Sequence, residues 1–267
     1  MRPASFTLPF YNHFLLPESQ LDRLEVVLVQ PRNPLNMGAA ARAMANFGLK
    51  RLSVVGAYAP HWQEARSAVG AETLLKTARE AASLSEAVAD CTLVIGTGTL
   101  TYRKPEQPVR TLPELAPTVC AELERGGRVA IVFGSEKHGM MREDLALCHL
   151  LVEIPTHPQQ PSMNLGQAVA VCLYELAGRT GESAYSAPFA ENFGPRPPAA
   201  ELDRVAAMIE ETMQAAHYSP AAHYSPAAMS KANRHDLNLM LRRLTIGPHD
   251  ARRILGLFRR ILNRLKR

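Results

Sequence analysis

Five short apolar runs that lack polar alternation set the strongest constraint on the fold. Stretches with helical patterns separate them, at 38–47, 65–84, 112–125 and 164–179. A strand that is buried on both faces needs no polar alternation, which is typical of a parallel sheet covered by helices. The chain is therefore predicted to form an α/β domain around a parallel sheet. The five runs are EVVLVQ (25–30), RLSVVG (51–56), TLVIG (92–96), RVAIVFG (128–134) and LLVEIP (150–155).

The chain divides into four predicted parts. Residues 1–20 contain three prolines and are expected to form an N-terminal arm. The α/β domain occupies 21–183, and a proline-rich linker follows at 184–200. Residues 201–267 are predicted to form a small all-helical C-terminal extension.

Two details of the extension bear on its structure. The hexapeptide HYSPAA occurs at 217–222 and again at 223–228, which we interpret as a short duplication in an exposed loop. The final helix is predicted to be amphipathic, with its arginines away from the apolar side. The apolar stripe consists of Ile254, Leu257, Phe258, Ile261, Leu262 and Leu265.

Positive charge is concentrated near the C-terminus. Residues 229–267 contain 11 Lys and Arg but only two acids, Asp236 and Asp250, although the whole chain has a net charge of only +5. The rest of the chain is therefore slightly acidic. Concentrated cationic charge suits a polyanionic partner.

The cysteines and the apolar runs indicate the compartment. No apolar stretch approaches the roughly 20 residues that cross a bilayer, so we expect no membrane partner. Cys91, Cys120, Cys148 and Cys172 lie too far apart for a CxxC-type metal site, and we expect free thiols, mostly buried. A cytoplasmic location is therefore predicted.

Four loops at the predicted strand ends are the candidate ligand-binding segments: 30–42, 96–103, 133–140 and 154–169. In an open parallel sheet, ligands bind at the carboxyl ends of the strands. These loops are rich in Gly, Asn, Ser and Thr, and they contain neither a cluster of metal ligands nor a nucleophile elbow. No P-loop motif occurs, and GTGTLT matches only half of the dinucleotide pattern, which disfavours nicotinamide binding.

Three segments carry a resemblance to a known family. NPLNMGAAAR (33–42), VFGSEKHGM (132–140) and IPTHPQQPSMNLGQAV (154–169) together resemble the signature motifs of the SpoU branch of the SPOUT RNA methyltransferases. The resemblance is strongest to the TrmJ-type tRNA methyltransferases. It extends from about Glu25 to Arg179, and the basic helical extension is also similar to the TrmJ type.

The resemblance implies a fold and a cofactor. It implies a parallel-sheet SPOUT fold with a trefoil knot in its C-terminal half, and a homodimer that binds RNA across both subunits. S-adenosyl-L-methionine is the implied cofactor, and no metal is expected. The positions that match the family's cofactor contacts are Thr97, Gly98, Thr99, Gly134, Ile154, Pro161, Ser162 and Met163.

The resemblance also implies a catalytic set, and each member has an ordinary structural interpretation. Arg42 matches the catalytic arginine, as either base or electrostatic stabiliser, although most helix arginines are simply solvated. Asn36 is either the N-cap of the helix, or close to it, or a hydrogen-bonding residue that fixes Arg42 or the substrate loop. Glu136 is implied to organise the site and is a candidate partner for Arg42 across the dimer. Ser162 and Asn164 complete the set, and one of them is expected to cap the helix at 164–179.

Together these features predict methylation of a ribose 2′-hydroxyl in RNA, most simply in the tRNA anticodon loop. Arg42 and the tail residues Arg259, Arg260 and Arg264 are the predicted RNA contacts. Two alternatives stay open from the sequence. One is an rRNA 2′-O-methyltransferase, and the other is a knotted RNA-binding protein without catalytic activity.

Overall fold

A seven-stranded sheet forms the centre of the protein. The computed structural model describes residues 16–99, 105–179, 196–216, 226–244 and 246–266. All strand pairs are parallel, in the order β3-β2-β1-β6-β4-β7-β5. This confirms the predicted parallel α/β sheet. The strands are β1 (Leu24–Val29), β2 (Arg51–Val55), β3 (Arg79–Ala81), β4 (Leu93–Thr97), β5 (Val109–Thr111), β6 (Val129–Phe133) and β7 (Leu150–Glu153).

The two edge strands, β3 and β5, were not predicted. Each has only three residues and is largely exposed, so neither contains an apolar run. Polar contacts hold β3 in place: the Arg79 guanidinium donates to the Ser53 hydroxyl at 3.0 Å and lies 3.6 Å from the Glu25 carboxylate. Such pairing depends on residues far apart in the chain, and a local pattern does not contain it.

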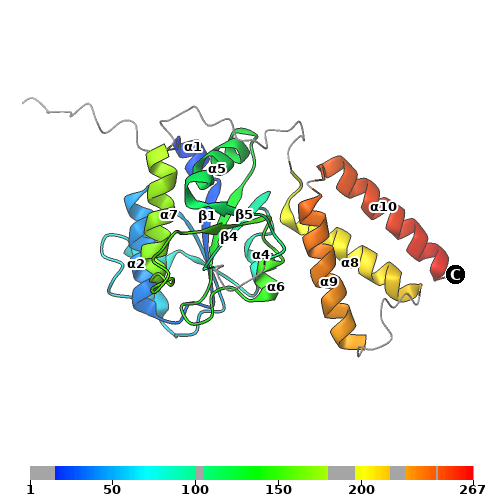
Figure 1. Ribbon diagram of the computed structural model, residues 1–267, viewed down its shortest axis with the longest axis horizontal. Coiled ribbons are helices and arrows are strands. Elements are labelled where there is room, and N and C mark those ends of the chain that lie inside the picture. Colours follow the sequence, from blue (N-terminus) through cyan, green and yellow to red (C-terminus); the bar gives the residue numbers. More distant parts are fainter. Residues whose placement is uncertain (1–15, 100–104, 180–195, 217–225, 245, 267) are drawn as a thin grey trace, which may run out of the picture.

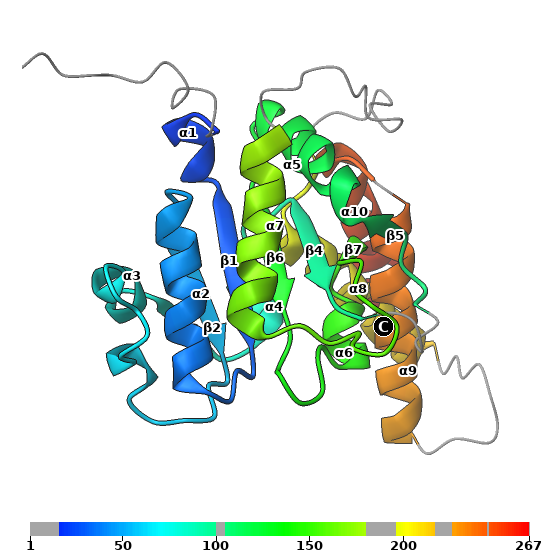
Figure 2. The ribbon, with the colours of Figure 1, turned by 60° about the vertical axis from the view of Figure 1, so that its left-hand side comes forward.

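Helices cover both faces of the sheet (Figures 1 and 2). Helices α2 and α7 pack together on one face. They approach so closely that a Cβ added to Gly166 would lie 2.6 Å from the Ala39 Cβ. Buried side chains of α4 and the start of α8 cover the other face. The helices of this part of the chain are α1 (Glu18–Leu21), α2 (Pro34–Asn46), α3 (Glu72–Lys76), α4 (Leu84–Ala87), α5 (Leu115–Glu124), α6 (Arg142–Leu145) and α7 (Leu165–Arg179).

The prediction of one helix over 65–84 is wrong. The segment instead contains α3, strand β3 and the beginning of α4, after a short 3₁₀ turn at Trp62–Glu64. Gly70 adopts a positive φ of 75°, a conformation that ends any helix passing through it. The apolar spacing there fits a helix locally, but the pairing of Arg79–Ala81 with β2 overrides it.

Three further helices follow: α8 (Ala199–Ala215), α9 (Pro226–Arg243) and α10 (Pro248–Leu265). Most of the predicted arm (1–20) and linker (184–200) lies outside the described residues. The arm's last residues belong to α1, and the linker's last two residues begin α8. The Ala199 N–H donates to the Cys91 carbonyl at 2.8 Å, which fixes that start against the sheet domain.

Helix α9 differs from the sequence interpretation, whereas α10 forms the expected helix. The second HYSPAA copy is not wholly a loop, because α9 begins at Pro226 within it; the first copy lies outside the described residues. Of the six stripe residues of α10, only Leu262 is buried, and Leu257, Ile261 and Leu265 are exposed. Contact with α8 covers just one side of α10.

The cysteines are free, as predicted. Cys91, Cys148 and Cys172 are buried, and Cys120 is partly buried. Burial raises the pKa of the Cys148 thiol to about 12, so it stays protonated and unreactive. Among the described residues, no helix combines the length and apolarity that a bilayer crossing requires.

A buried arginine joins the C-terminal helices to the sheet domain. The Arg242 side chain on α9 is 1% exposed. Its guanidinium donates to the Leu147 carbonyl and to the Asp203 carboxylate of α8, both at 2.9 Å, and to the Asn238 side chain at 3.2 Å. Three elements therefore share one buried cation.

We expect Arg242→Ala to lower the free energy of unfolding by about 3 kcal/mol, because it removes a buried guanidinium that bonds the Asp203 carboxylate, the Leu147 carbonyl and Asn238 at once. Urea denaturation measures the change. Arg243→Ala is the matched control, since it removes the same charge from the next, exposed position and should change stability by less than about 0.5 kcal/mol. Equal effects of the two variants would contradict this role for Arg242.

Candidate functional site

A cavity of about 280 Å³ opens at the carboxyl ends of β4, β6 and β7. The loops that follow β1 and β6 lie beside one another at this edge, the lower edge in Figure 2. Its volume is close to the lower end of the range for small-molecule sites, about 300–1,000 Å³. All eight residues that the sequence suggested as cofactor contacts line the cavity: Thr97, Gly98, Thr99, Gly134, Ile154, Pro161, Ser162 and Met163.

Threonine hydroxyls hold the walls of the cavity together. The Thr99 hydroxyl donates to the Pro161 carbonyl at 2.8 Å, and the Thr156 hydroxyl donates to the same carbonyl at 3.1 Å. The buried Thr97 hydroxyl donates to the Val132 carbonyl at 2.9 Å. An added Cβ at Gly98 would meet no atom within 4 Å, so the wall is open at that point.

Gly134 begins a tight loop at the end of β6. Ser135 and Gly139 exchange two backbone hydrogen bonds, of 2.7 and 3.2 Å, and Gly139 has a φ of 63°. A Cβ at Gly134 would lie 2.2 Å from the backbone nitrogen of Met140. Backbone atoms have little room to move away, so only glycine fits at Gly134.

A chain of hydrogen bonds joins the three motif loops. The Asn164 side-chain amide donates to the Asn36 Oδ1 at 2.8 Å, and the Asn36 amide donates to the Glu136 carboxylate at 2.9 Å. The backbone N–H groups of Arg32 and Asn33 donate to the same carboxylate at 2.8 and 3.1 Å. Partial burial alone would raise the pKa of Glu136. The hydrogen bonds from Asn36 and the two amides outweigh it and hold the pKa below its ordinary value of 4.5.

The helix caps decide between the two interpretations of Asn36. The N-cap of α2 is Asn33, whose side chain accepts the Leu35 N–H at 2.9 Å. The interpretation of Asn36 as the cap is therefore wrong, because the helix begins at Pro34. Asn36 instead lies in the first turn and bonds Glu136. Asn164 caps α7, as expected for one of the two candidates, by accepting the Gly166 N–H at 3.0 Å.

Arg42 is not brought into this network within one chain. It lies on the exposed face of α2, opposite the buried Met37, Ala40 and Met44, as its helix position predicted. Arg42 neither lines the cavity nor forms an ion pair with Glu136. Ser162 does line the cavity and is exposed.

The predicted RNA contacts of the tail are on α10. Arg259, Arg260 and Arg264 are all exposed there. Helix α10 lies at the end of the molecule opposite α2 (Figure 1). A ligand that touches both helices of one chain would have to extend along most of the molecule.

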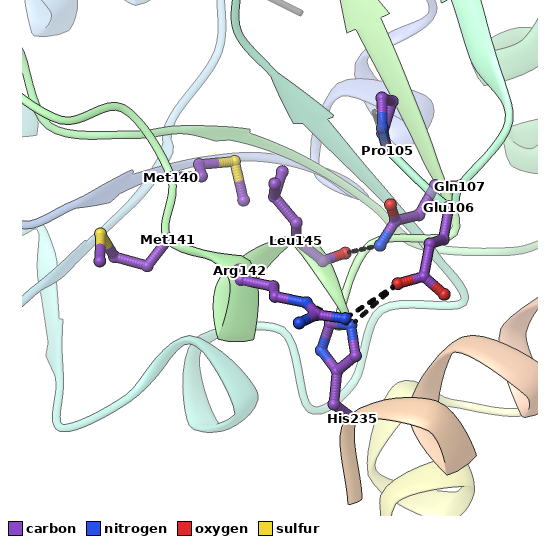
Figure 3. Close-up of a pocket in the computed structure, with 8 residues that line it drawn as sticks. All are labelled: Pro105, Glu106, Gln107, Met140, Met141, Arg142, Leu145 and His235. Atoms are coloured by element: carbon purple, nitrogen blue, oxygen red, sulfur yellow. Dashed lines mark hydrogen bonds and ion pairs between the residues drawn. The ribbon is translucent and has the colours of Figure 1, made fainter. Parts of the chain in front are cut away.

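A second cavity, of about 270 Å³, lies where α9 meets the sheet domain (Figure 3). The Arg142 guanidinium bonds the Glu106 carboxylate and the His235 imidazole, each at 3.2 Å. Met140 lines both cavities. No motif in the sequence indicated Glu106, Arg142 or His235, because their pairing depends on how α9 docks.

Three relatives with assigned names match part of this chain. A tRNA (cytidine/uridine/adenosine-2′-O-)-methyltransferase TrmJ of Pseudomonas aeruginosa is 42% identical over 157 residues, 58% of this chain and 61% of the relative. A relative from Haemophilus influenzae, named as an uncharacterized tRNA/rRNA methyltransferase, is 39% identical over 63% of its length. This chain thus spans about six tenths of the length of these two relatives. A TrmJ of Pectobacterium atrosepticum is 32% identical over 72% of this chain and 80% of the relative.

The solved structures agree with this match. A crystal structure of TrmJ from Z. mobilis superposes with a TM-score of 0.73 at 28% identity, over 89% of this chain and 98% of that one. The model of the SpoU rRNA methylase family matches residues 23–174, which contain all three motif loops and the cavity. The chain therefore belongs to the SpoU methylase family.

Proposed function

We propose that this protein transfers a methyl group from S-adenosyl-L-methionine to a ribose 2′-hydroxyl of tRNA. One observation carries the proposal: the second and third motif loops and the β4 loop line one cavity that includes all eight expected cofactor-contact residues, and the Asn164–Asn36–Glu136 network bonds the first motif loop to them. The names of the Pseudomonas and Pectobacterium relatives support the reaction and the substrate.

The cavity fits such a cofactor. Its lining combines glycines and small polar residues with apolar side chains such as Phe133 and Met163, and this suits an extended ligand that has both polar and apolar parts. We propose that the loop at 154–164 completes a trefoil knot. The bonds from Thr99 to Pro161 and from Asn164 to Asn36 support this, because they hold the loop against both the β4 loop and α2.

Methyl transfer to an alcohol needs alignment and stabilisation of the developing alkoxide. S-adenosyl-L-methionine, when bound, supplies an electrophilic methyl group. A ribose hydroxyl is a weak acid, so a fixed positive charge beside it lowers the barrier. Arginine is a poor base in proteins. We therefore assign Arg42 the role of electrostatic stabiliser and phosphate anchor.

We propose that the active form is a homodimer in which Arg42 of the partner subunit completes the site. The positions of Arg42 and Glu136 support this proposal. Arg42 is exposed on α2, whereas Glu136 borders the cavity, and no ion pair joins them within one chain. A second copy packed on the α2 face would bring the two groups together and place the RNA across both subunits.

Substrate and location belong to the same proposal. The basic α10, exposed at the end of the molecule, suits the backbone of a folded RNA, and we propose the tRNA anticodon loop as the methylated region. An rRNA substrate is the second candidate, because the family description and the Haemophilus relative's name include rRNA.

We propose a cytoplasmic location on the basis of the free cysteines.

Nucleoside mass spectrometry of tRNA and rRNA incubated with the enzyme and S-adenosyl-L-methionine tests the reaction. A 2′-O-methylated nucleoside in tRNA is the expected product. A methylated base would contradict the ribose assignment. Product in rRNA alone would favour the second candidate, and calorimetry that shows no cofactor binding would favour a non-catalytic RNA-binding protein.

We expect Arg42→Ala to lower methyl transfer at least a hundredfold while calorimetry shows unchanged cofactor binding, because the charge acts only on the reacting hydroxyl and the RNA. Glu136→Gln should also be nearly inactive. If the site is shared, equal co-expression of the two variants should restore about a quarter of the wild-type rate, because half of the dimers then have one intact site. No recovery would contradict a site shared between subunits.

We expect Glu136→Gln to destabilise the protein by about 2 kcal/mol at neutral pH, because the amide loses charge-assisted bonds from two backbone N–H groups and Asn36. The folded-state pKa of Glu136 is lowered, so its contribution is present above the ordinary pKa of 4.5 and is lost as the pH falls through the folded value. Urea denaturation should show the difference between variant and wild type shrinking below about pH 4.5. A difference that does not change with pH would contradict this assignment.

We expect neutralisation of Arg259, Arg260 and Arg264 to weaken tRNA binding. It should also flatten the dependence of affinity on salt, by about one unit of slope for each phosphate group that the variant no longer neutralises. Filter binding between about 50 and 200 mM salt measures both effects. Arg125→Ala is a control at an exposed position at the amino end of the sheet and should leave the slope unchanged. An unchanged slope in the triple variant would leave α10 without a role in RNA binding.

A further inference from the structure

Two left-handed turns lie side by side where β1 and β2 end. Gln30 has a φ of 49° and Gly56 a φ of 58°. The Gln30 N–H donates to the Val55 carbonyl at 2.7 Å, so the two turns are bonded to each other. For a residue such as Gln, this conformation costs about 1 kcal/mol or more. Strain of this kind persists where the surrounding structure holds it in place, and it is common at functional sites.

The turns direct Arg32 and Tyr58 toward one another. The Arg32 guanidinium carbon lies 4.4 Å from the centre of the Tyr58 ring, within the range of a cation–π contact. Arg32 is exposed, and Tyr58 is 71% exposed, the largest exposed fraction among the large hydrophobic residues described. Two planar groups therefore lie together in contact with solvent.

This pair adjoins the candidate active site. The backbone N–H of Arg32 donates to Glu136 at 2.8 Å, so one residue bonds the site through its backbone and contacts Tyr58 through its side chain. The stacked pair is not needed to hold the two loops together, because the Tyr58 N–H already donates to the Pro31 carbonyl at 3.1 Å. Neither side chain contributes to the buried core.

We propose that Arg32 and Tyr58 form a stacking platform for a nucleobase next to the nucleotide whose ribose is methylated. The proposal rests on the proposed RNA methyltransferase activity and extends it to a substrate-positioning pair. Aromatic rings and arginine planes are the groups on which proteins stack unpaired RNA bases. A ribose that enters a cavity must be drawn out of its helical stack, and the neighbouring bases then need a new stacking partner.

The platform acts on RNA binding and leaves cofactor binding unchanged. Loss of one base–aromatic stack corresponds to roughly a five- to hundredfold loss of affinity. Tyr58→Ala should therefore raise the KM for tRNA at least fivefold. Tyr58→Phe keeps the ring and should restore the wild-type KM. Cofactor affinity by calorimetry and the melting temperature should stay the same in both variants.

Steady-state methylation of a tRNA transcript is the primary test. Arg32→Ala should raise the KM for tRNA as Tyr58→Ala does, and its matched control Arg125→Ala, which also removes an exposed arginine, should leave the KM unchanged. The decisive measurement uses transcripts with an abasic site on either side of the methylated nucleotide. On the transcript that lacks the stacked base, wild type and Tyr58→Ala should have the same KM, because the interaction is already absent.

The outcomes separate this inference from the proposed function. A KM for Tyr58→Ala equal to that of wild type overturns the platform while the activity stands. A fall in cofactor affinity or melting temperature in Tyr58→Ala also overturns it, since the ring would then be structural. An effect of Tyr58→Ala that persists on both abasic transcripts overturns it too, because Tyr58 would then contact something other than a flanking base. A wild-type enzyme that methylates neither tRNA nor rRNA would instead contradict the proposed function.

Discussion

The hydrogen bonds that the Glu136 carboxylate accepts are the interaction on which the site depends. This carboxylate receives bonds from the β1–α2 loop and from Asn36, and Asn36 in turn accepts from Asn164 at the start of α7. One partly buried anion thus fixes three loops that lie far apart in the chain. A carboxylate suits this position because it accepts several bonds at once and attracts amide donors more strongly than a neutral group does.

Small residues make that arrangement possible. The site loops approach one another at backbone distance, and a side chain at Gly134 would collide with the turn that forms one wall of the cavity. Gly166 has the same function on α7, where it allows that helix to lie against Ala39 of α2. Because α2 and α7 pack so closely, the amide of Asn164 reaches Asn36. The close packing of α2 against α7 therefore also fixes the geometry of the site.

Prediction from the sequence succeeded where local pattern and burial agree. Each long apolar run forms a strand, because a strand that is covered by helices on both faces of the sheet is apolar at nearly every position. The loops at the strand ends could be grouped around one site for the same reason, since parallel strands end at one edge. The failure is at Arg79–Ala81, where a polar contact with a distant residue helps to decide the structure and a local pattern contains no trace of it. At Asn36 the sequence offered two interpretations, and the contact with distant Glu136 decides between them.

The sequence by itself determined the parallel sheet, the loops at its carboxyl edge and the excess of positive charge on α10, because hydrophobic burial and residue type are local. The eight cavity residues came instead from the resemblance of three motifs to a known family. Only the tertiary structure decided that Asn36 bonds Glu136, that Arg242 joins α9 to the sheet domain, and that Arg32 stacks on Tyr58 beside the site. Each of these depends on the distance between side chains brought together by packing, and packing is a property of the whole chain.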